Sequence, residues 1–538
     1  MTGAVADPLT FDPADLPGFY ARAGRLSGRD CTLSLRTILL GPDVLERLPE
    51  VLSAPIASDR HPELNPGFEI PAYAGMTESM RHPGLDPGSH AGADVLLVMD
   101  DRPMERAGES LKPLVEGILA EAGRSVRRVV LADPHGLHTT PAMIDRVREQ
   151  LSPGTVVVSV GSGTITDIAK HAVHGWEEAH PGRRLTHVAV ATANSVGAYT
   201  SQLAVVTVQG VKRTEPSRLP EALVLDTRTL ADTPEQYALG GIGDAAVGWC
   251  SLADYRLAAW CGLGSWEPLS KAAFLPGLTA FLDQDPAFAT GGTATADAMA
   301  RTLCAAGFAM SFAGESAPAS GLEHVTSHML DMAAPAHRRP IGNHGEQCGL
   351  ATALVLIAYE YLLTEFDPSG FAGGLPPVDL DRERRSVDEV FAPLDPSGAM
   401  AAECWRDYAA KCAAWEAHRD DVVRLLETWD ERSAELRELV ADPGRYLAAL
   451  AATGHPIDFA DVPPGLSRAE VRWAFTHARL MRRRLSVADL LGFLGLWTDE
   501  LVDRVFARFD ELRSRVQPSA GGEPPIDALN SRAAGCSA

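Results

Sequence analysis

Short apolar runs separated by helical stretches constrain the fold of residues 33–226 more than any other feature of the sequence. Five such runs follow one another along the chain: LSLRTILL, DVLLVM, VRRVVLA, GTVVVSV and THVAVAT. Strands buried on both faces have runs of this kind, because neither side of the strand meets water. Helices between successive strands are the connections that parallel pairing requires. The pattern therefore predicts an α/β domain built on a parallel sheet.

The pattern changes at about residue 235, where long segments rich in Ala, Leu, Arg and Glu with helical spacing begin. We expect a mainly α-helical second domain, with the charged stretch 364–445 as a helical excursion of it. The expected organisation of the 538-residue chain is an N-terminal extension over 1–30, an α/β domain over 31–234, a helical domain over 235–515 and a disordered tail over 516–538.

A segment rich in Pro and Gly interrupts the α/β pattern between its first helix and its second strand. It contains HPELNPGFEIPAYAGMTESMRHPGLDPGSHAGAD, although connections at such places usually have about two to six residues. The segment has no hydrophobic period, so we expect residues 57–92 to be a disordered insertion without a functional role. The alternative is a lid or a loop that contacts a partner.

The charge balance restricts the partners. The chain has 48 basic and 71 acidic residues, a net charge of −23, and such a surface repels phosphate backbones and anionic lipids. The apolar run GLATALVLIAYEYLL is too short to span a bilayer and is interrupted by Glu360. We therefore expect a small-molecule substrate, no nucleic-acid partner and no membrane insertion.

Cysteine usage and the N-terminus indicate the compartment. The eight cysteines form no CxxC pair, so they read as reduced thiols. The first residues, MTGAVADPLTFDPADLPG, have neither the basic nor the apolar region of a secretion signal. We expect a cytoplasmic protein, and the sequence leaves its oligomeric state open, a homo-oligomer included.

The stretch VVVSVGSGTITDIAKHA reads as a strand, a glycine turn and a helix. Gly161 and Gly163 let the backbone approach a ligand closely, and the start of the following helix offers free N–H groups to a pyrophosphate. The stretch is neither GxGxxG nor a P-loop. A glycine turn with a purely structural role is the alternative, and the position of the turn after a buried strand favours the binding role.

Asp100 ends the apolar run VLLVMD. A carboxylate at such a strand end can accept hydrogen bonds from an adenosine ribose, and it would repel a 2′-phosphate, so it favours NAD over NADP. A solvated loop acid is the alternative interpretation.

Three stretches of the helical half carry candidate metal ligands: GGIGDAAVGW with Asp244, GLEHVTSH with His324 and His328, and IGNHGEQCGLAT with His344. One carboxylate with two or three imidazoles suits Zn²⁺, Fe²⁺ or Ni²⁺ and leaves positions open for a substrate oxygen. The HxxxH pair lacks the Glu of HExxH, which disfavours a zincin peptidase. Two histidines four apart are otherwise often a surface or packing feature of a helix.

Six stretches in this order resemble the glycerol-1-phosphate dehydrogenase branch of the iron-containing alcohol dehydrogenase and glycerol dehydrogenase superfamily, over roughly residues 31–505: VGSGTITDIAKHA, VATANSVGAYTS, GIGDAAVGW, GLEHVTSH, NHGEQCGLAT and ARLMRRRLSVADLL. The resemblance implies a Rossmann-like NAD(P)-binding domain followed by a helical metal-binding domain, the architecture of dehydroquinate synthase. It implies a metal- and NAD(P)-dependent dehydrogenase that interconverts a small polyol phosphate and its ketone.

The resemblance also implies roles for individual residues. Asp244, His324 and His344 would bind the metal, His328 would contact substrate, and Asp244 and His328 would be the catalytic residues. The cofactor would contact a set of residues in the α/β half: Asp100, Gly161, Ser162, Gly163, Thr164, Ile165, Thr192, Ser195 and Ser201.

Two positions depart from the family pattern. Gly197 stands where an Asp usually helps to hold a substrate hydroxyl, and Gly248 stands where a lysine often follows GxGD. A phosphorylated substrate would also need cations, which Arg338 and Arg339 of AHRRPIGNHG could supply; an exposed basic loop is the alternative. The arginines of RLMRRRLS would, on a helix, form a solvated face.

Other functions remain open at this point. One is a dehydrogenase of the same scaffold with a less hydroxylated substrate. Another is a sugar-phosphate cyclase of the dehydroquinate synthase type, which oxidises its substrate only transiently. A third is a non-catalytic family member, which the presence of all the expected metal ligands disfavours. Net formation of NADH would separate the dehydrogenase from the cyclase.

Overall fold

The computed structural model of the protein describes residues 9–52, 95–134, 136–208, 211–289 and 291–516. The insertion expected over 57–92 lies outside these residues, as does the expected tail from residue 517 onward.

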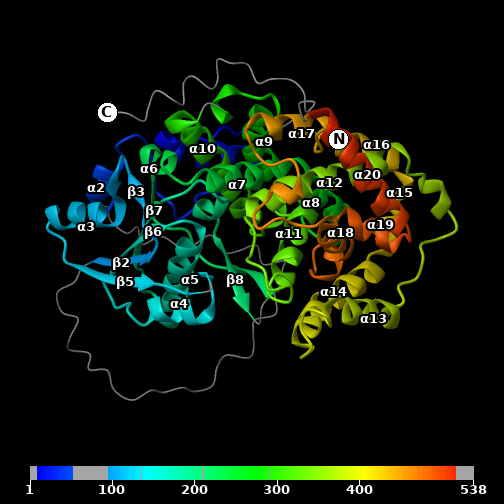
Figure 1. The fold of residues 1–538 in the computed structure, drawn as a ribbon, viewed down its shortest axis with the longest axis horizontal. Coiled ribbons are helices and arrows are strands. Elements are labelled where there is room, and N and C mark those ends of the chain that lie inside the picture. Colours follow the sequence, from blue (N-terminus) through cyan, green and yellow to red (C-terminus); the bar gives the residue numbers. More distant parts are fainter. Residues whose placement is uncertain (1–8, 53–94, 135, 209–210, 290, 517–538) are drawn as a thin grey trace.

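A six-stranded sheet forms the N-terminal half (Figure 1), with the strand order β1-β10-β7-β6-β2-β5 and only parallel pairs. The strands are β1 (Thr37–Gly41), β2 (Val95–Asp100), β5 (Val126–Leu131), β6 (Val156–Gly161), β7 (Thr186–Ala191) and β10 (Ala222–Asp226). The parallel α/β fold is therefore confirmed, and each of the five apolar runs contains a strand. The sixth strand, β10, was not predicted.

Helices cover both faces of the sheet: α2 (Leu48–Leu52), α3 (Leu111–Glu121), α4 (Pro141–Arg148) and α5 (Gly163–Ala179). Alternate strand residues face opposite layers, as a period of two requires. Leu97 and Val158 pack in one apolar cluster with α2 and α3, whereas Leu96 and Val157 pack in another with α4 and α5. Both faces of the sheet are therefore covered by apolar side chains, which explains why the strands appear in the sequence as continuous apolar runs.

Two antiparallel hairpins were not predicted. They pair β3 (Glu105–Arg106) with β4 (Glu109–Ser110), and β8 (Leu203–Val208) with β9 (Val211–Pro216). A buried lysine ties the second hairpin to α5, because Lys170 Nζ donates to the carbonyls of Ala198 at 2.9 Å, Ser201 at 3.0 Å and Leu203 at 2.6 Å. The lysine thereby fixes the turn that leads into β8.

From residue 227 to residue 516 the described chain is helical (Figure 1). The helices are α6 (Thr227–Ala231), α7 (Glu235–Ala246), α8 (Gly248–Trp260), α9 (Pro268–Leu282), α10 (Gly292–Ala313), α11 (Leu322–Ala333), α12 (His344–Thr364), α13 (Leu380–Phe391), α14 (Ala399–Ala417), α15 (Arg419–Glu427), α16 (Trp429–Arg437), α17 (Pro443–Ala452), α18 (Arg468–His477), α19 (Val487–Phe493) and α20 (Asp499–Val516). In the part of the chain that the structure describes, α12 is the one helix with the length and composition of a membrane span, and it is a mostly buried core helix.

The N-terminal segment packs onto the helical half. Helix α1 (Leu16–Ser27) buries Phe19 against Phe308 of α10, with the ring centroids 4.9 Å apart. The chain therefore contacts the second half before it enters the sheet at β1.

Candidate active site

The glycine turn has the predicted order of a strand, a turn and a helix. Strand β6 ends at Gly161 and α5 begins at Gly163, with no side-chain cap on Ser162 between them. A Cβ on Gly161 would lie 2.5 Å from Cβ of Ile165, and a Cβ on Gly163 would lie 2.5 Å from Cγ2 of Val196. Local packing therefore requires both glycines, and the start of α5 stays uncapped by its own side chains.

A second turn follows β7 and lies beside the first. The backbone N–H of Thr192 donates to the Gly161 carbonyl at 3.2 Å, and the short helix η3 (Gly197–Thr200) comes next in the chain. Ser195 is half-buried between these two points. The Ser201 hydroxyl accepts the Leu203 N–H at 3.2 Å, so it is engaged within its own turn.

The remaining residues expected at the cofactor lie as follows. Thr164 is half-buried and Ile165 is buried in the first turn of α5. Asp100 ends β2, the strand next to β6, where its carboxylate pairs with Lys112 and accepts the N–H of Arg102 at 3.1 Å. The Asp100 carboxylate therefore already has cationic and backbone partners in this structure.

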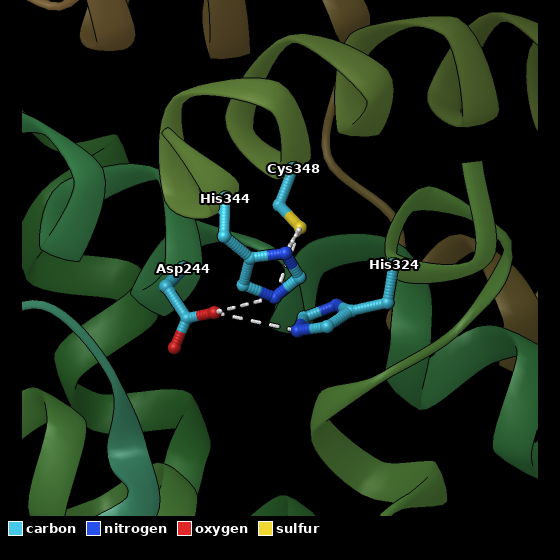
Figure 2. A group of neighbouring side chains, drawn as sticks. All are labelled: Asp244, His324, His344 and Cys348. Atoms are coloured by element: carbon cyan, nitrogen blue, oxygen red, sulfur yellow. Dashed lines mark hydrogen bonds and ion pairs between the residues drawn. The ribbon is translucent and has the colours of Figure 1, made fainter. Parts of the chain in front are cut away.

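Four side chains from three helices converge in the helical half (Figure 2). They are Asp244 from α7, His324 from α11, and His344 and Cys348 from α12, and one ligand atom from each lies within 4.8 Å of the others. Asp244 Oδ1 is 3.3 Å from Nε2 of His324 and 3.9 Å from Nε2 of His344. The structure thus brings together all three residues expected at the metal and adds a thiol.

Glycines allow the helices to approach closely enough for this group to form. A Cβ on Gly345 would lie 1.8 Å from the Gly240 carbonyl oxygen, and a Cβ on Gly243 would lie 2.1 Å from the Gly345 carbonyl oxygen. Helices α7 and α12 therefore touch backbone to backbone, which places Asp244 opposite the first turn of α12.

Hydrogen bonds orient the two histidines of the group. Nδ1 of His324 lies 3.0 Å from the Glu323 carboxylate, which can only accept, so the ring donates from Nδ1. Nδ1 of His344 lies 2.8 Å from Ser327 Oγ, and that hydroxyl donates to Gln347 Oε1 at 2.7 Å, so His344 also donates from Nδ1. Nε2 of His344 is left with its lone pair, Nε2 of His324 gains one when a cation displaces its proton, and both Nε2 atoms face Asp244. This is how histidines that bind metal are oriented in proteins.

The electrostatic environment agrees with a cation site. Burial by itself would lower the pKa of His324, but Cys348, Asp244 and Glu323 raise that pKa well above its usual value. Burial, and then Lys212 and His324, lower the pKa of His344 well below its usual value, so its ring is neutral. Burial raises the pKa of the Cys348 thiol. A carboxylate, two imidazoles whose Nε2 atoms face it and a thiol fit a divalent transition metal such as zinc.

His328 lies one turn beyond His324 on α11 and is outside the four-residue group. Its ring stacks on that of His344, with centroids 5.3 Å apart, and its Nδ1 accepts from the Arg482 guanidinium at 3.1 Å. Burial, then Arg482 and Lys212, lower the pKa of His328 well below its usual value. The neutral ring therefore carries its proton on Nε2 and is a hydrogen-bond donor there, in contrast to His324 and His344.

The two arginines that the sequence suggested for a phosphorylated substrate have other surroundings than His328. Arg338 is exposed, and Arg339 donates to Glu470 at 3.1 Å and to the Leu330 carbonyl at 2.8 Å. The stretch RLMRRRLS is not a continuous helix: Arg479 lies in the short helix η8 (Ala478–Leu480), and the other three arginines follow in an irregular segment that precedes α19. The expectation of a solvated helical face is therefore wrong for Arg482.

Sequence reasoning missed four contributors to this site: Glu323, Ser327, Cys348 and Arg482. Cys348 had a local signal, because it lies four residues after His344 and so on the same face of a helix. The other three act through contacts between side chains that no spacing in the sequence reveals.

Both departures from the family pattern have packing reasons. The N–H of Gly197 donates to Asp244 Oδ2 at 3.3 Å, and a Cβ on Gly197 would lie 3.1 Å from the Leu303 carbonyl oxygen of α10. A Cβ on Gly248 would lie 2.5 Å from Cδ1 of Leu278. Neither position has room for the usual side chain without movement of its neighbours.

Comparison with known proteins agrees with these features. Residues 84–234 match the family described as iron-containing alcohol dehydrogenase. The glycerol-1-phosphate dehydrogenase [NAD(P)+] of Methanothrix thermoacetophila is 30% identical over 242 residues, which are 44% of this chain and 63% of that protein. The Bacillus subtilis enzyme of the same name is 30% identical over 222 residues, 40% of this chain and 55% of that protein.

The chain therefore matches less than two thirds of the length of these curated relatives. Among solved structures, a probable glycerol dehydrogenase from Sinorhizobium meliloti is similar with a TM-score of 0.49 and 15% identity, over 89% of this chain and 98% of that one. On these sequence matches, residues 84–234 of the chain are similar to the iron-containing alcohol dehydrogenase family, and a longer stretch is similar to curated glycerol-1-phosphate dehydrogenases.

Proposed function

We propose that the protein is a metal-dependent, NAD(P)-linked dehydrogenase that interconverts a small polyol phosphate and its ketone. The names of its relatives suggest glycerol 1-phosphate and dihydroxyacetone phosphate as this pair. Asp244, His324 and His344 would hold the metal, and the turns at 161–165 and 192–201, with Asp100, would hold the cofactor.

One observation carries the proposal: a single carboxylate joins the two candidate sites. Asp244 Oδ1 faces the Nε2 atoms of His324 and His344, while Oδ2 accepts the N–H of Gly197. Gly197 belongs to the turn that begins at Thr192, which bonds to Gly161 of the glycine turn. The residues proposed to hold the metal thus lie directly against the segment expected to bind nicotinamide.

When bound, the metal would act as a Lewis acid toward the substrate oxygen while the nicotinamide exchanges hydride with the adjacent carbon. The protein's own contribution is to orient these groups. With its proton on Nε2, His328 can donate a hydrogen bond to a substrate oxygen. It cannot take a proton at that atom, and Arg482 occupies its other nitrogen. The proton of the hydroxyl would therefore exchange with water.

Gly197 favours a second candidate, a dehydrogenase of the same scaffold with a less hydroxylated substrate. An Asp at this position would accept a hydrogen bond from a polyol, and losing such a bond in a buried site costs about 1–3 kcal/mol. The Gly197 N–H instead points to Asp244. The two candidates share the metal and cofactor chemistry and differ only in the substrate.

The test is the reduction of dihydroxyacetone phosphate by the metal-loaded protein with NADH and with NADPH, beside a panel of unphosphorylated ketones. The proposal expects net oxidation of the nicotinamide with the phosphorylated ketone and none after removal of the metal. Turnover of an unphosphorylated ketone alone would support the second candidate. Conversion of a sugar phosphate without net change in NADH would instead support a cyclase and contradict both.

A further inference from the structure

Arg482 is a half-buried cation in contact with the candidate substrate histidine. Its guanidinium donates to Nδ1 of His328 at 3.1 Å, and this is its one hydrogen-bond partner among the residues described by the structure. No Asp or Glu among those residues forms an ion pair with it. Its other N–H groups have no hydrogen-bond partner among those residues and are not fully buried. They therefore face accessible space.

Two neighbouring arginines, Arg213 and Arg479, form ion pairs with carboxylates of the protein. Arg213 of β9 pairs with Glu403 and, at 3.0 Å, with Asp407. Arg479 pairs with Glu383 at 3.2 Å, and Arg484 donates to the Ser316 hydroxyl at 2.6 Å. Arg482 thus differs from Arg213 and Arg479, because its one partner among the described residues is a neutral imidazole; Arg484 likewise has a neutral partner, the Ser316 hydroxyl.

A second cation reaches the same histidine from another element. Lys212 of β9 pairs with Asp331 of α11 at 2.6 Å, and Asp331 lies one turn beyond His328 on that helix. The charges of Lys212 and Arg482 both act on His328 and disfavour its protonated form. Two cations from separate parts of the chain therefore flank the face of α11 that follows the metal ligand His324.

Asp331 partners Lys212, but no nearby carboxylate neutralises Arg482 among the described residues. Asp407 is held by Arg213, and half-buried Glu215 lies near enough to Arg482 for its pKa to be affected but forms no ion pair with it. Partial burial of a guanidinium without a counter-ion is costly, and a bound anion removes that cost. A guanidinium presents a planar fork of donors that matches phosphate oxygens in pairs.

We propose that Arg482, together with Lys212, forms an anion subsite beside His328 that takes the phosphoryl group of the substrate. The existence of the subsite follows from these contacts, and only the identity of its natural ligand rests on the proposed function. The subsite replaces Arg338 and Arg339 as the source of cations for a phosphorylated substrate. It would hold the phosphoryl end while His328 and the metal ligands hold the reacting end.

The direct test is calorimetric titration of the metal-loaded protein with inorganic phosphate. We expect binding by the wild type, weakened at least about tenfold by Arg482→Gln and less by Arg482→Lys, which keeps the charge but loses the fork. Arg483→Gln is the matched control, because it removes the same charge from the exposed neighbouring side chain. Equal metal content and melting temperature would show that each variant is folded. Binding by Arg482→Gln as tight as that of the wild type, or no binding by the wild type, would overturn the subsite.

Two further arms separate the sources of a phosphate group. If the subsite belonged to the cofactor, saturating NADH would abolish phosphate binding by the wild type, and the proposal would be wrong; we expect binding to persist. In kinetics, the ratio of kcat/KM for dihydroxyacetone phosphate to that for dihydroxyacetone should fall at least about tenfold in Arg482→Gln. If the protein reduced neither ketone, the proposed function would fail, while the phosphate titration would still decide whether the subsite exists.

Discussion

The hydroxyl oxygen of Ser327 lies 2.8 Å from Nδ1 of His344. Because Ser327 donates its own proton to Gln347, it holds His344 with Nε2 free to bind a cation. Ser327→Ala should therefore weaken metal binding by about 10–100-fold, the usual effect of losing such a partner. Competition with a chromogenic chelator measures this affinity. Thr326→Ala is the control, since it removes a neighbouring buried hydroxyl that bonds only to the Leu322 carbonyl. Equal affinities of both variants would contradict the role of Ser327.

The two histidines of α11, His324 and His328, should differ in a metal analysis. His324→Ala removes a proposed ligand atom and should lose most of the metal, whereas His328→Ala removes a ring whose Nδ1 is already occupied by Arg482. We expect His328→Ala to keep about the wild-type metal content and to lose turnover or substrate affinity. Elemental analysis of the purified proteins gives the content. An equal loss of metal from the two variants would mean that their roles are not distinct.

The position of Cys348 in the group leads to predictions about which metal the site binds more tightly and how many protons metal binding releases. Thiolate ligands favour zinc over harder ions, so Cys348→Ala should weaken zinc more than manganese. Burial raises the pKa of the Cys348 thiol, so the metal-free protein keeps a proton there near pH 7, whereas His344 is neutral. Zinc must displace the thiol proton, so uptake should release at least about one proton more from the wild type than from Cys348→Ala.

Calorimetry in buffers of different ionisation enthalpy counts these protons. As the pH rises above the raised pKa of the Cys348 thiol, the metal-free wild type no longer has this proton to release, so the difference between the two proteins should fall. Release of the same number by wild type and Cys348→Ala would show that the thiol does not bind zinc.

Restoring the usual family residue at position 197 should harm this protein. A Cβ at Gly197 would lie 3.1 Å from the Leu303 carbonyl oxygen, and a carboxylate there would also face Asp244. Gly197→Asp should lower the free energy of unfolding by about 1–3 kcal/mol, the range for overpacking, without a gain in polyol turnover. Gly197→Ala, which tests the steric part alone, should be milder. Thermal melting and ketone reduction measure the two effects, and a more active, equally stable Gly197→Asp protein would contradict the packing argument.

The fold could be predicted from the sequence where the residues of one short segment were enough to indicate its secondary structure. Strands such as β6 and β7 are buried on both faces, so each appears as an unbroken apolar run. Strand β9 was missed because it is a hairpin strand whose residues after Val211 are half-buried and mostly polar, and such a pattern resembles a loop.

The helix expected around Arg482 does not form, because a lysine distant in the sequence donates hydrogen bonds to backbone carbonyls of this segment. Buried Lys411 donates to the carbonyls of Arg479 at 2.6 Å and of Arg484 at 3.1 Å. Those carbonyls are therefore engaged by an ammonium group, and the chain bends so that Arg482 reaches His328. The candidate metal ligands could be named because the motifs resemble a family, whereas the roles of Glu323 and Ser327 depend on contacts that only the structure shows.

The shared carboxylate of Asp244 also has a thermodynamic meaning. One oxygen faces the metal ligands and the other holds the N–H of Gly197, so a charge bound at the first changes the hydrogen bond made by the second. Linkage then requires reciprocity: whatever factor the metal applies to the affinity for NADH, NADH must apply to the affinity for the metal. The two cofactors of this protein would thus be a coupled pair, each setting how tightly the other is retained.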